Sequence, residues 1–165
     1  MSTLLRFLQL IAMVVWVGGV IFFAFVLAPV AFGTLPTHQL AGSVVGGSLR
    51  ILHVMGFVCG GVFWLATLVL FRRAPMRVRG RYEMELLLAS VMLLLTAYLQ
   101  VNVLPAMEID RAHAGGDIES VAETHPARVH FNKFHAISED VEGGVLLIGI
   151  GVLLLMAREN HDAPA

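Results

Sequence analysis

Hydrophobic stretches without a single Asp, Glu, Lys or Arg follow one another along the chain. They cover residues 7–32, 51–71, 86–107 and 145–157. At about 1.5 Å of rise per residue, each of the first three is long enough for a helix that crosses about 30 Å of hydrocarbon. The fourth is shorter, so its helix has to include polar residues that precede Val145. The pattern predicts four membrane-spanning helices, over residues 5–32, 50–72, 83–107 and 132–157.

Two segments between these stretches have a weaker helical pattern. Small and apolar side chains are spaced along residues 37–48, which predicts a short helix at the membrane surface, separate from the span that follows. Residues 113–129 predict another short helix, broken before Pro126 because proline disfavours a helical conformation at the residue before it. Nothing in the pattern indicates a strand.

The composition indicates that these four helices belong to a membrane protein. Of the 165 residues, 58% are hydrophobic and 14% are charged, and a soluble core could not hide that much apolar surface. We therefore expect an all-α fold, a single integral membrane domain over residues 1–165. It forms a four-transmembrane-helix bundle in the inner or plasma membrane of the cell, with the lipid bilayer as its main partner. The only cysteine, Cys59, leaves no disulfide or cysteine metal cluster within one chain.

Charged residues between the helices predict the orientation. The segment 72–82 contains Arg72, Arg73, Arg77, Arg79 and Arg81. Short loops rich in arginine stay on the cytoplasmic side, so this basic loop lies inside and both termini are cytoplasmic. The loop over residues 108–131 is rich in acidic side chains and then faces outward. Because membrane topology explains the arginines fully, we expect no nucleic-acid partner.

Glycines are frequent in the predicted helices. Gly56 and Gly60 form a GxxxG pair in the second helix, a spacing that lets two helix backbones approach closely. We expect the same packing role for Gly18, Gly19, Gly143, Gly144, Gly149 and Gly151.

Histidines collect at one side of the predicted membrane. Six of the seven fall on or near the outer face: His38, His53, His113, His125, His130 and His135. The inner half of the bundle is predicted to be nearly all apolar. On the fourth helix, His135, Glu139 and Glu142 follow at i, i+4 and i+7 and share one stripe. His53 shares a stripe with the GxxxG pair, so both stripes are predicted to meet in the outer half.

Imidazoles and carboxylates together favour a metal site. They are ordinary ligands of zinc, copper and iron, and ionised carboxylates inside a membrane need partners. We predict His53, His135, Glu139 and Glu142 as metal ligands, with Gln100 and Asn102 lining the same outward-facing pocket. The predicted function is binding or handling of a metal cation or small polar ligand there. In the other interpretation, the fourth helix starts in water and its acids lie at headgroup level.

Several alternatives stay open. His53 and His135 could be axial ligands of a haem between the second and fourth helices. The chain could instead be a non-catalytic accessory subunit of a larger membrane complex, or a homo-oligomer. A transporter ranks last, because the inner half offers almost no polar lining. No GxSxG, HExxH or Gly-rich phosphate loop is present, so no enzyme is predicted.

Three segments resemble a known family. Residues 16–32, WVGGVIFFAFVLAPVAF, resemble the W-x-G-x-x-x-F-F…P-x-x-F signature of the transmembrane-protein-205-like family of small membrane proteins. The stretches AGSVVG at 41–46 and FNKFHAIS at 131–138 are also similar to that family. The resemblance implies a four-helix membrane fold of undefined biochemistry. The eukaryotic namesake is linked to platinum-drug resistance, so the resemblance also suggests metal or drug handling.

Overall fold

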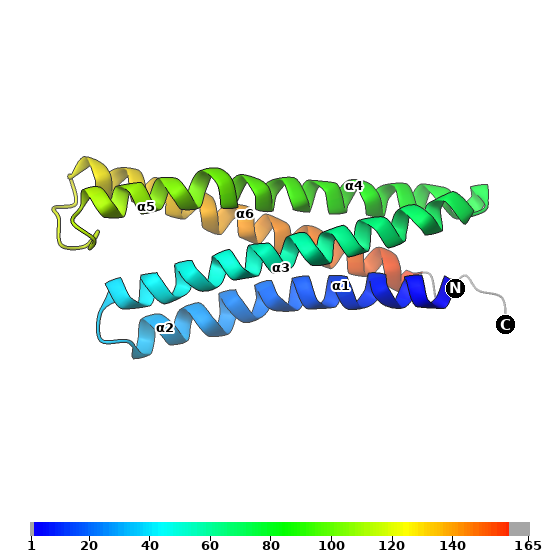
Figure 1. Ribbon diagram of the computed structural model, residues 1–165, viewed down its shortest axis with the longest axis horizontal. Helices are drawn as coiled ribbons and strands as arrows, with labels where there is room; N and C mark the ends of the chain where they lie inside the picture. The colour runs from blue at the N-terminus through cyan, green and yellow to red at the C-terminus, as the bar shows by residue number, and fades with distance from the viewer. Residues whose placement is uncertain (1, 159–165) are drawn as a thin grey trace.

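The computed structural model describes residues 2–158, and no strand occurs among them. Four long helical runs lie side by side in an antiparallel bundle (Figure 1). The runs consist of α1 (Ser2–Phe22), the π-helical turn η1 (Phe23–Leu27) and α2 (Ala28–Thr34); α3 (His38–Arg73); α4 (Met76–Tyr98), the π-helical turn η2 (Leu99–Val103) and α5 (Leu104–His113); and α6 (Pro126–Ala157). The predicted all-α bundle is confirmed.

The two ends of the bundle differ in their connections. At the basic end, α1 begins, α6 finishes and residues 74–75 join α3 to α4, next to the arginines of segment 72–82. At the loop end, residues 35–37 join α2 to α3, and residues 114–125 join α5 to α6. His161 lies outside the described residues, and the other six histidines lie on the loop-end half.

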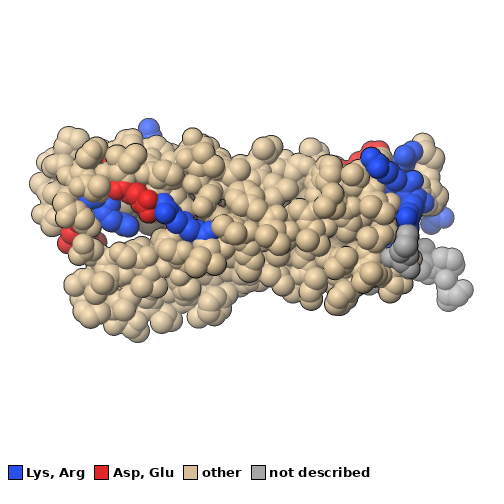
Figure 2. Space-filling model, in the orientation of Figure 1, with Lys and Arg blue, Asp and Glu red and all other residues tan. Residues whose placement is uncertain are grey.

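The length of the uncharged belt matches a bilayer. All four runs are long and apolar enough to cross a membrane, and Figure 2 shows charged side chains gathered at the two ends with an uncharged belt between them. On α3 the belt runs from Arg50 to Arg72, and on the third run from Glu85 to Glu108, a rise of about 33 to 35 Å. A hydrocarbon core is about 30 Å thick. The chain is therefore a multi-pass membrane protein, as predicted.

The second helix begins earlier than predicted. α3 is continuous from His38 to Arg73, so the short surface helix expected over residues 37–48 and the span expected from residue 50 are one element. Thr37 caps its start, because the Thr37 side chain accepts a hydrogen bond from the Leu40 N–H at 3.2 Å. α3 contains no proline that would end the helix. Arg50 within it is charged, and its long side chain reaches Glu108 while the helix continues. The prediction of two separate helices, over residues 37–48 and 50–72, is therefore wrong.

The third run continues past its predicted end at residue 107. Pro105 lacks an N–H and its ring clashes with the carbonyl four residues earlier, which usually ends or kinks a helix. Here the π turn η2 accommodates it, and the Leu104 N–H bonds to the Leu99 carbonyl five residues back. α5 then extends to His113.

The fourth run begins at Pro126, not at residue 132. The His125 side chain caps it by accepting a hydrogen bond from the Ala127 N–H, and proline at the first helical position needs no partner for its missing N–H. The short helix predicted over residues 113–129 is absent. Residues 114–125 form turns instead, with φ of 75° at Gly115 and 97° at Gly116.

Glycines pack the centre of the bundle, although fewer of them than predicted. A Cβ at Gly56 or Gly60 would lie 2.7 Å from the Trp16 ring, and Trp16 itself is 1% exposed. Gly19 and Gly149 are equally close to their neighbours, which confirms the packing role of these four. The expectation is wrong for Gly18, Gly143, Gly144 and Gly151, where an added Cβ would meet nothing within 4 Å.

Candidate functional site

His53 lies at the meeting point of three helical runs. It belongs to α3 and is 2% exposed. Its Nδ1 is 2.9 Å from Oε1 of Gln100 in η2, and its Nε2 is 2.5 Å from Oε1 of Glu142 in α6. The Glu142 side chain is 15% exposed. The stripe through His53 and the stripe through Glu142 therefore meet in the bundle, as the sequence predicted.

The π turn η2 shapes the position of Gln100. A π turn adds one residue to a helix and so rotates the side chains that follow it. η2 ends two residues before Pro105, and η1 ends two residues before Pro29. In both runs the proline has no N–H to donate to the carbonyl four residues back. The residue before it, Leu104 or Ala28, donates to the carbonyl five residues back. Single π turns occur often at functional sites.

The hydrogen bonds around His53 place one proton between His53 and Glu142. Since the Gln100 Oε1 can only accept, Nδ1 of His53 carries a proton and donates it. Nε2 then faces the Glu142 carboxyl oxygen with a single proton between them. The pair is either imidazolium with carboxylate or imidazole with carboxylic acid. In both forms one proton lies between His53 Nε2 and Glu142 Oε1.

This site lies just inside the loop-end edge of the uncharged belt. Arg50 of α3 pairs with Glu108 of α5 at 2.5 Å, and both side chains are about half exposed. His53 follows Arg50 by one helical turn, about 4.5 Å deeper along α3. A buried polar site within one turn of a charged boundary can exchange with water at that end more easily than with water at the other.

The remaining predicted residues lie elsewhere. His135 and Glu139 form their own pair on α6 at 3.4 Å, with side chains 52% and 71% exposed, and His135 stacks on Phe131. Asn102 is exposed. Among residues 2–158, no three His, Cys, Asp or Glu side chains form a group that could hold a metal ion. The four predicted ligands are thus divided into two pairs, because His135 and Glu139 lie outside the buried face of α6, which contains Ser138 and Val145.

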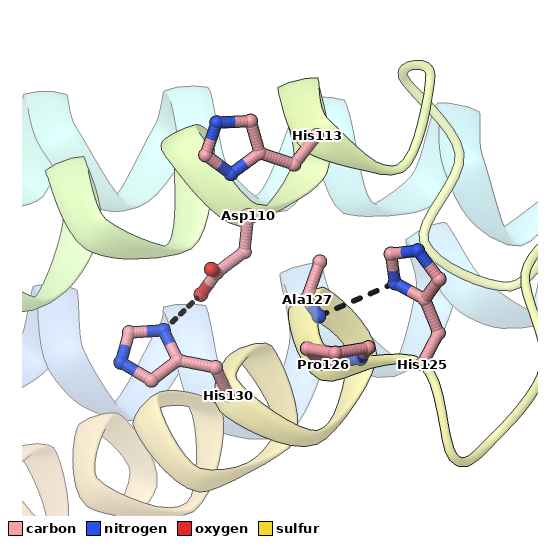
Figure 3. Close-up of a pocket in the computed structure, with 6 residues that line it drawn as sticks. All are labelled: Asp110, His113, His125, Pro126, Ala127 and His130. Carbon is pink, nitrogen blue, oxygen red and sulfur yellow. Dashed lines mark hydrogen bonds and ion pairs between the residues drawn. The ribbon is translucent and has the colours of Figure 1, made fainter.

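A pocket of about 390 Å³ opens at the loop end. Its lining residues are Asp110, His113, His125, Pro126, Ala127 and His130. Figure 3 shows the rings of His113 and His130 on either side of Asp110, with Asp110 Oδ2 2.7 Å from His130 Nδ1. The sequence could not predict this grouping, because its histidines are spread over the end of α5, the connecting loop and the start of α6.

A second buried polar group lies near the basic end and was missed by the sequence analysis. Glu85 is 1% exposed, and its carboxylate is 3.1 Å from Arg81 Nε. The Gln9 amide donates to Thr67 Oγ1 at 2.7 Å and lies 3.4 Å from Glu85 Oε2. The expectation of a nearly apolar inner half is therefore wrong. The signal was present: Gln9 and Thr67 are polar residues within otherwise apolar stretches.

A family model described as a domain of unknown function, DUF4149, matches residues 11–111. The matched region runs from α1 to α5, so it includes His53 and Gln100 but ends before Glu142. No curated protein and no solved structure matches the chain. The likeness to the transmembrane-protein-205-like family stays a resemblance.

Proposed function

The chain belongs to the DUF4149 family, whose function is unknown, and we propose that it binds one transition-metal cation at the buried His53–Glu142 pair. In the absence of the metal, a proton lies between the two side chains, and metal binding would have to move His53 Nε2 and Glu142 Oε1 further apart than the 2.5 Å seen here. His53 Nε2 and Glu142 Oε1 are the two protein ligands, and Gln100 orients the imidazole. We propose a binding role without catalysis.

The hydrogen bond from His53 to Gln100 carries this proposal. A histidine that binds a metal through one ring nitrogen almost always donates its other N–H to an oxygen, which fixes the tautomer and the ring orientation. His53 already has that arrangement, with Nδ1 on the Gln100 oxygen at 2.9 Å and Nε2 directed at a carboxylate. Metal binding would displace the proton between them, because metal ligands must be deprotonated.

Two protein ligands suit an ion that is handed on rather than stored. Structural metal sites usually surround the ion with four protein ligands, whereas open sites keep positions for water or an incoming group. An ion held by His53 and Glu142 alone would keep such open positions. This favours reversible binding over a structural role.

We also propose that the loop end faces outward and the basic end faces the cytoplasm of a cell with this protein in its inner or plasma membrane. The arginines at 72–82 support this orientation through the positive-inside rule. The ion would then come from the outer side, since His53 lies one turn from the loop-end boundary.

The haem alternative fits the geometry less well. Both ring nitrogens of His53 already contact protein side chains, so a haem iron would have to displace Glu142 or Gln100. The second predicted axial ligand, His135, is half exposed and paired with Glu139. A role as an accessory subunit or homo-oligomer has no particular observation in its favour, and it becomes the conclusion if the metal experiment fails.

The test is elemental analysis of the detergent-purified protein by plasma mass spectrometry after loading with zinc or copper and removal of free ion. We expect His53→Asn/Glu142→Gln to lose one bound ion per chain. The matched control is His135→Asn/Glu139→Gln. It removes the exposed His135–Glu139 pair within α6 and should keep the ion. Equal metal in wild type and both variants, or none in any of them, would overturn the proposal.

A further inference from the structure

The loop-end half of the bundle is divided into two arms. α2 packs on the first part of α3, and α5 packs on α6. Figure 1 shows these two pairs diverging towards the loop end, and Figure 2 shows a hollow between them. We call residues 28–47, which comprise α2, the connecting turn and the start of α3, the lid arm.

Polar contacts join the lid arm and the adjoining Arg50 to the opposite arm. They are Arg50 with Glu108 at 2.5 Å, His38 with Glu119 at 2.9 Å, and the Gln39 amide with the Gly116 carbonyl at 3.1 Å. The side chains of the two ion pairs are between 42% and 61% exposed. Exposed ion pairs are weak and are screened by salt. Little free energy therefore holds the lid arm against its neighbour at this end.

Each of the two helical runs that form the lid arm contains a flexible point, and the two points lie at the same depth. The first is the π turn η1, directly before α2. The second is Gly46–Gly47 in α3, where an added Cβ would meet nothing within 4 Å. Counted along the helices from the turn at residues 35–37, the centre of η1 lies level with about residue 47 of α3. Kinks in helices form at π turns and at glycines.

We propose that the lid arm opens about η1 and Gly46–Gly47 and gives water at the loop end access to His53. His53 lies two helical turns beyond Gly46, directly below the Arg50–Glu108 pair. In the closed form seen here, His53 is 2% exposed. Only the identity of the ion that is exchanged rests on the proposed function. The opening motion itself requires no bound cation.

The test measures the distance between the arms in lipid nanodiscs. Spin labels are attached by Val44→Cys on the lid arm and Ile109→Cys on α5, in a Cys59→Ala background. Val44 and Ile109 are exposed, at 48% and 57%, so labels there should not disturb packing. The distance distribution from double electron–electron resonance is recorded for this protein and for the same protein with both ion pairs removed by Arg50→Gln/His38→Gln.

We expect removal of the two pairs to increase the population with the longer distance by about 2- to 30-fold, the range for two exposed ion pairs. The control variant, His135→Gln/Glu139→Gln, removes an ion pair within α6 that does not join the arms, and should leave the distribution unchanged. An unchanged distribution in both variants would overturn the lid. So would an equal change in both, which would mean general loosening. Metal content measured on the same samples separates failure of the lid from failure of the cation site.

Discussion

Replacing His53 or Glu142 by leucine, singly and together, measures how strongly the two side chains interact. An interhelical hydrogen bond between neutral groups in a membrane contributes about 0.6 kcal/mol on average and about 1.7 kcal/mol at most. Removing one partner of a buried ion pair costs about 3–5 kcal/mol, because a charge is left without compensation. His53 is 2% and Glu142 15% exposed, so the pair belongs to the buried class.

We therefore expect each single substitution to destabilise the bundle by about 3 kcal/mol or more if the pair is ionic. The double variant should recover much of that loss, because two leucines bury no charge. The coupling energy of the cycle should then exceed about 1.7 kcal/mol, the upper limit for a neutral membrane hydrogen bond.

The assay is unfolding by increasing SDS in mixed micelles, followed by tryptophan fluorescence. Trp16 is a suitable reporter, because it is fully buried against Gly56, one turn from His53. The control is the same cycle on His135 and Glu139, an exposed pair expected to couple by less than about 1 kcal/mol. If the His53–Glu142 coupling is no larger than that of the control, the reasoning about a buried cation position is refuted.

Two further predictions concern the packing and the topology. Gly60→Leu should destabilise the bundle by about 1–3 kcal/mol through overpacking, because its Cβ would lie 2.7 Å from Trp16; Gly61→Ala, with open space, should not, and the same SDS assay compares them. Cysteines introduced by Arg77→Cys and Ser120→Cys should react with a membrane-impermeant maleimide from opposite sides of the membrane, with the residue 77 site reacting from the cytoplasmic side. Labelling of both from one side would contradict the four-span topology.

Helix number and membrane insertion could be predicted from the sequence because they depend on local composition. A stretch such as residues 86–107 contains no charged residue, and its length alone determines that it can cross a bilayer. Helix ends were harder to place. Pro105 would usually end or kink a helix, but the π turn that ends two residues before it lets the run continue to His113. No pattern in the hydrophobic positions reveals that turn.

The site was predicted in part because helical spacing places side chains on faces but does not fix which faces meet. His53 and Glu142 were each assigned to an inward stripe, and they do meet. Glu139 was assigned to the same stripe as Glu142, yet it is exposed. Ser138, one residue before Glu139, is buried, and it shares a stripe with Glu142 and Val145 at i, i+4 and i+7. Glu139 lies about 100° away from that stripe, so helical face rather than depth along α6 decided the outcome.

The position of the two buried polar groups bears on how an ion could use this protein. His53 and Thr67 both belong to α3 and are separated by 14 residues, about 21 Å along the helix axis. The space between these levels is filled by apolar side chains that are almost completely buried: Trp16, Phe63, Met92 and Val145 are each 0–1% exposed. Packing of this density leaves no room for water or a hydrated ion. If the proposed function holds, a cation would reach His53 from the loop end once the lid arm opens. The buried Glu85 group is a separate polar contact among α1, α3 and α4. The proposed binding would therefore take place at one face of a single chain, and conduction would require a second conformation in which this apolar layer separates.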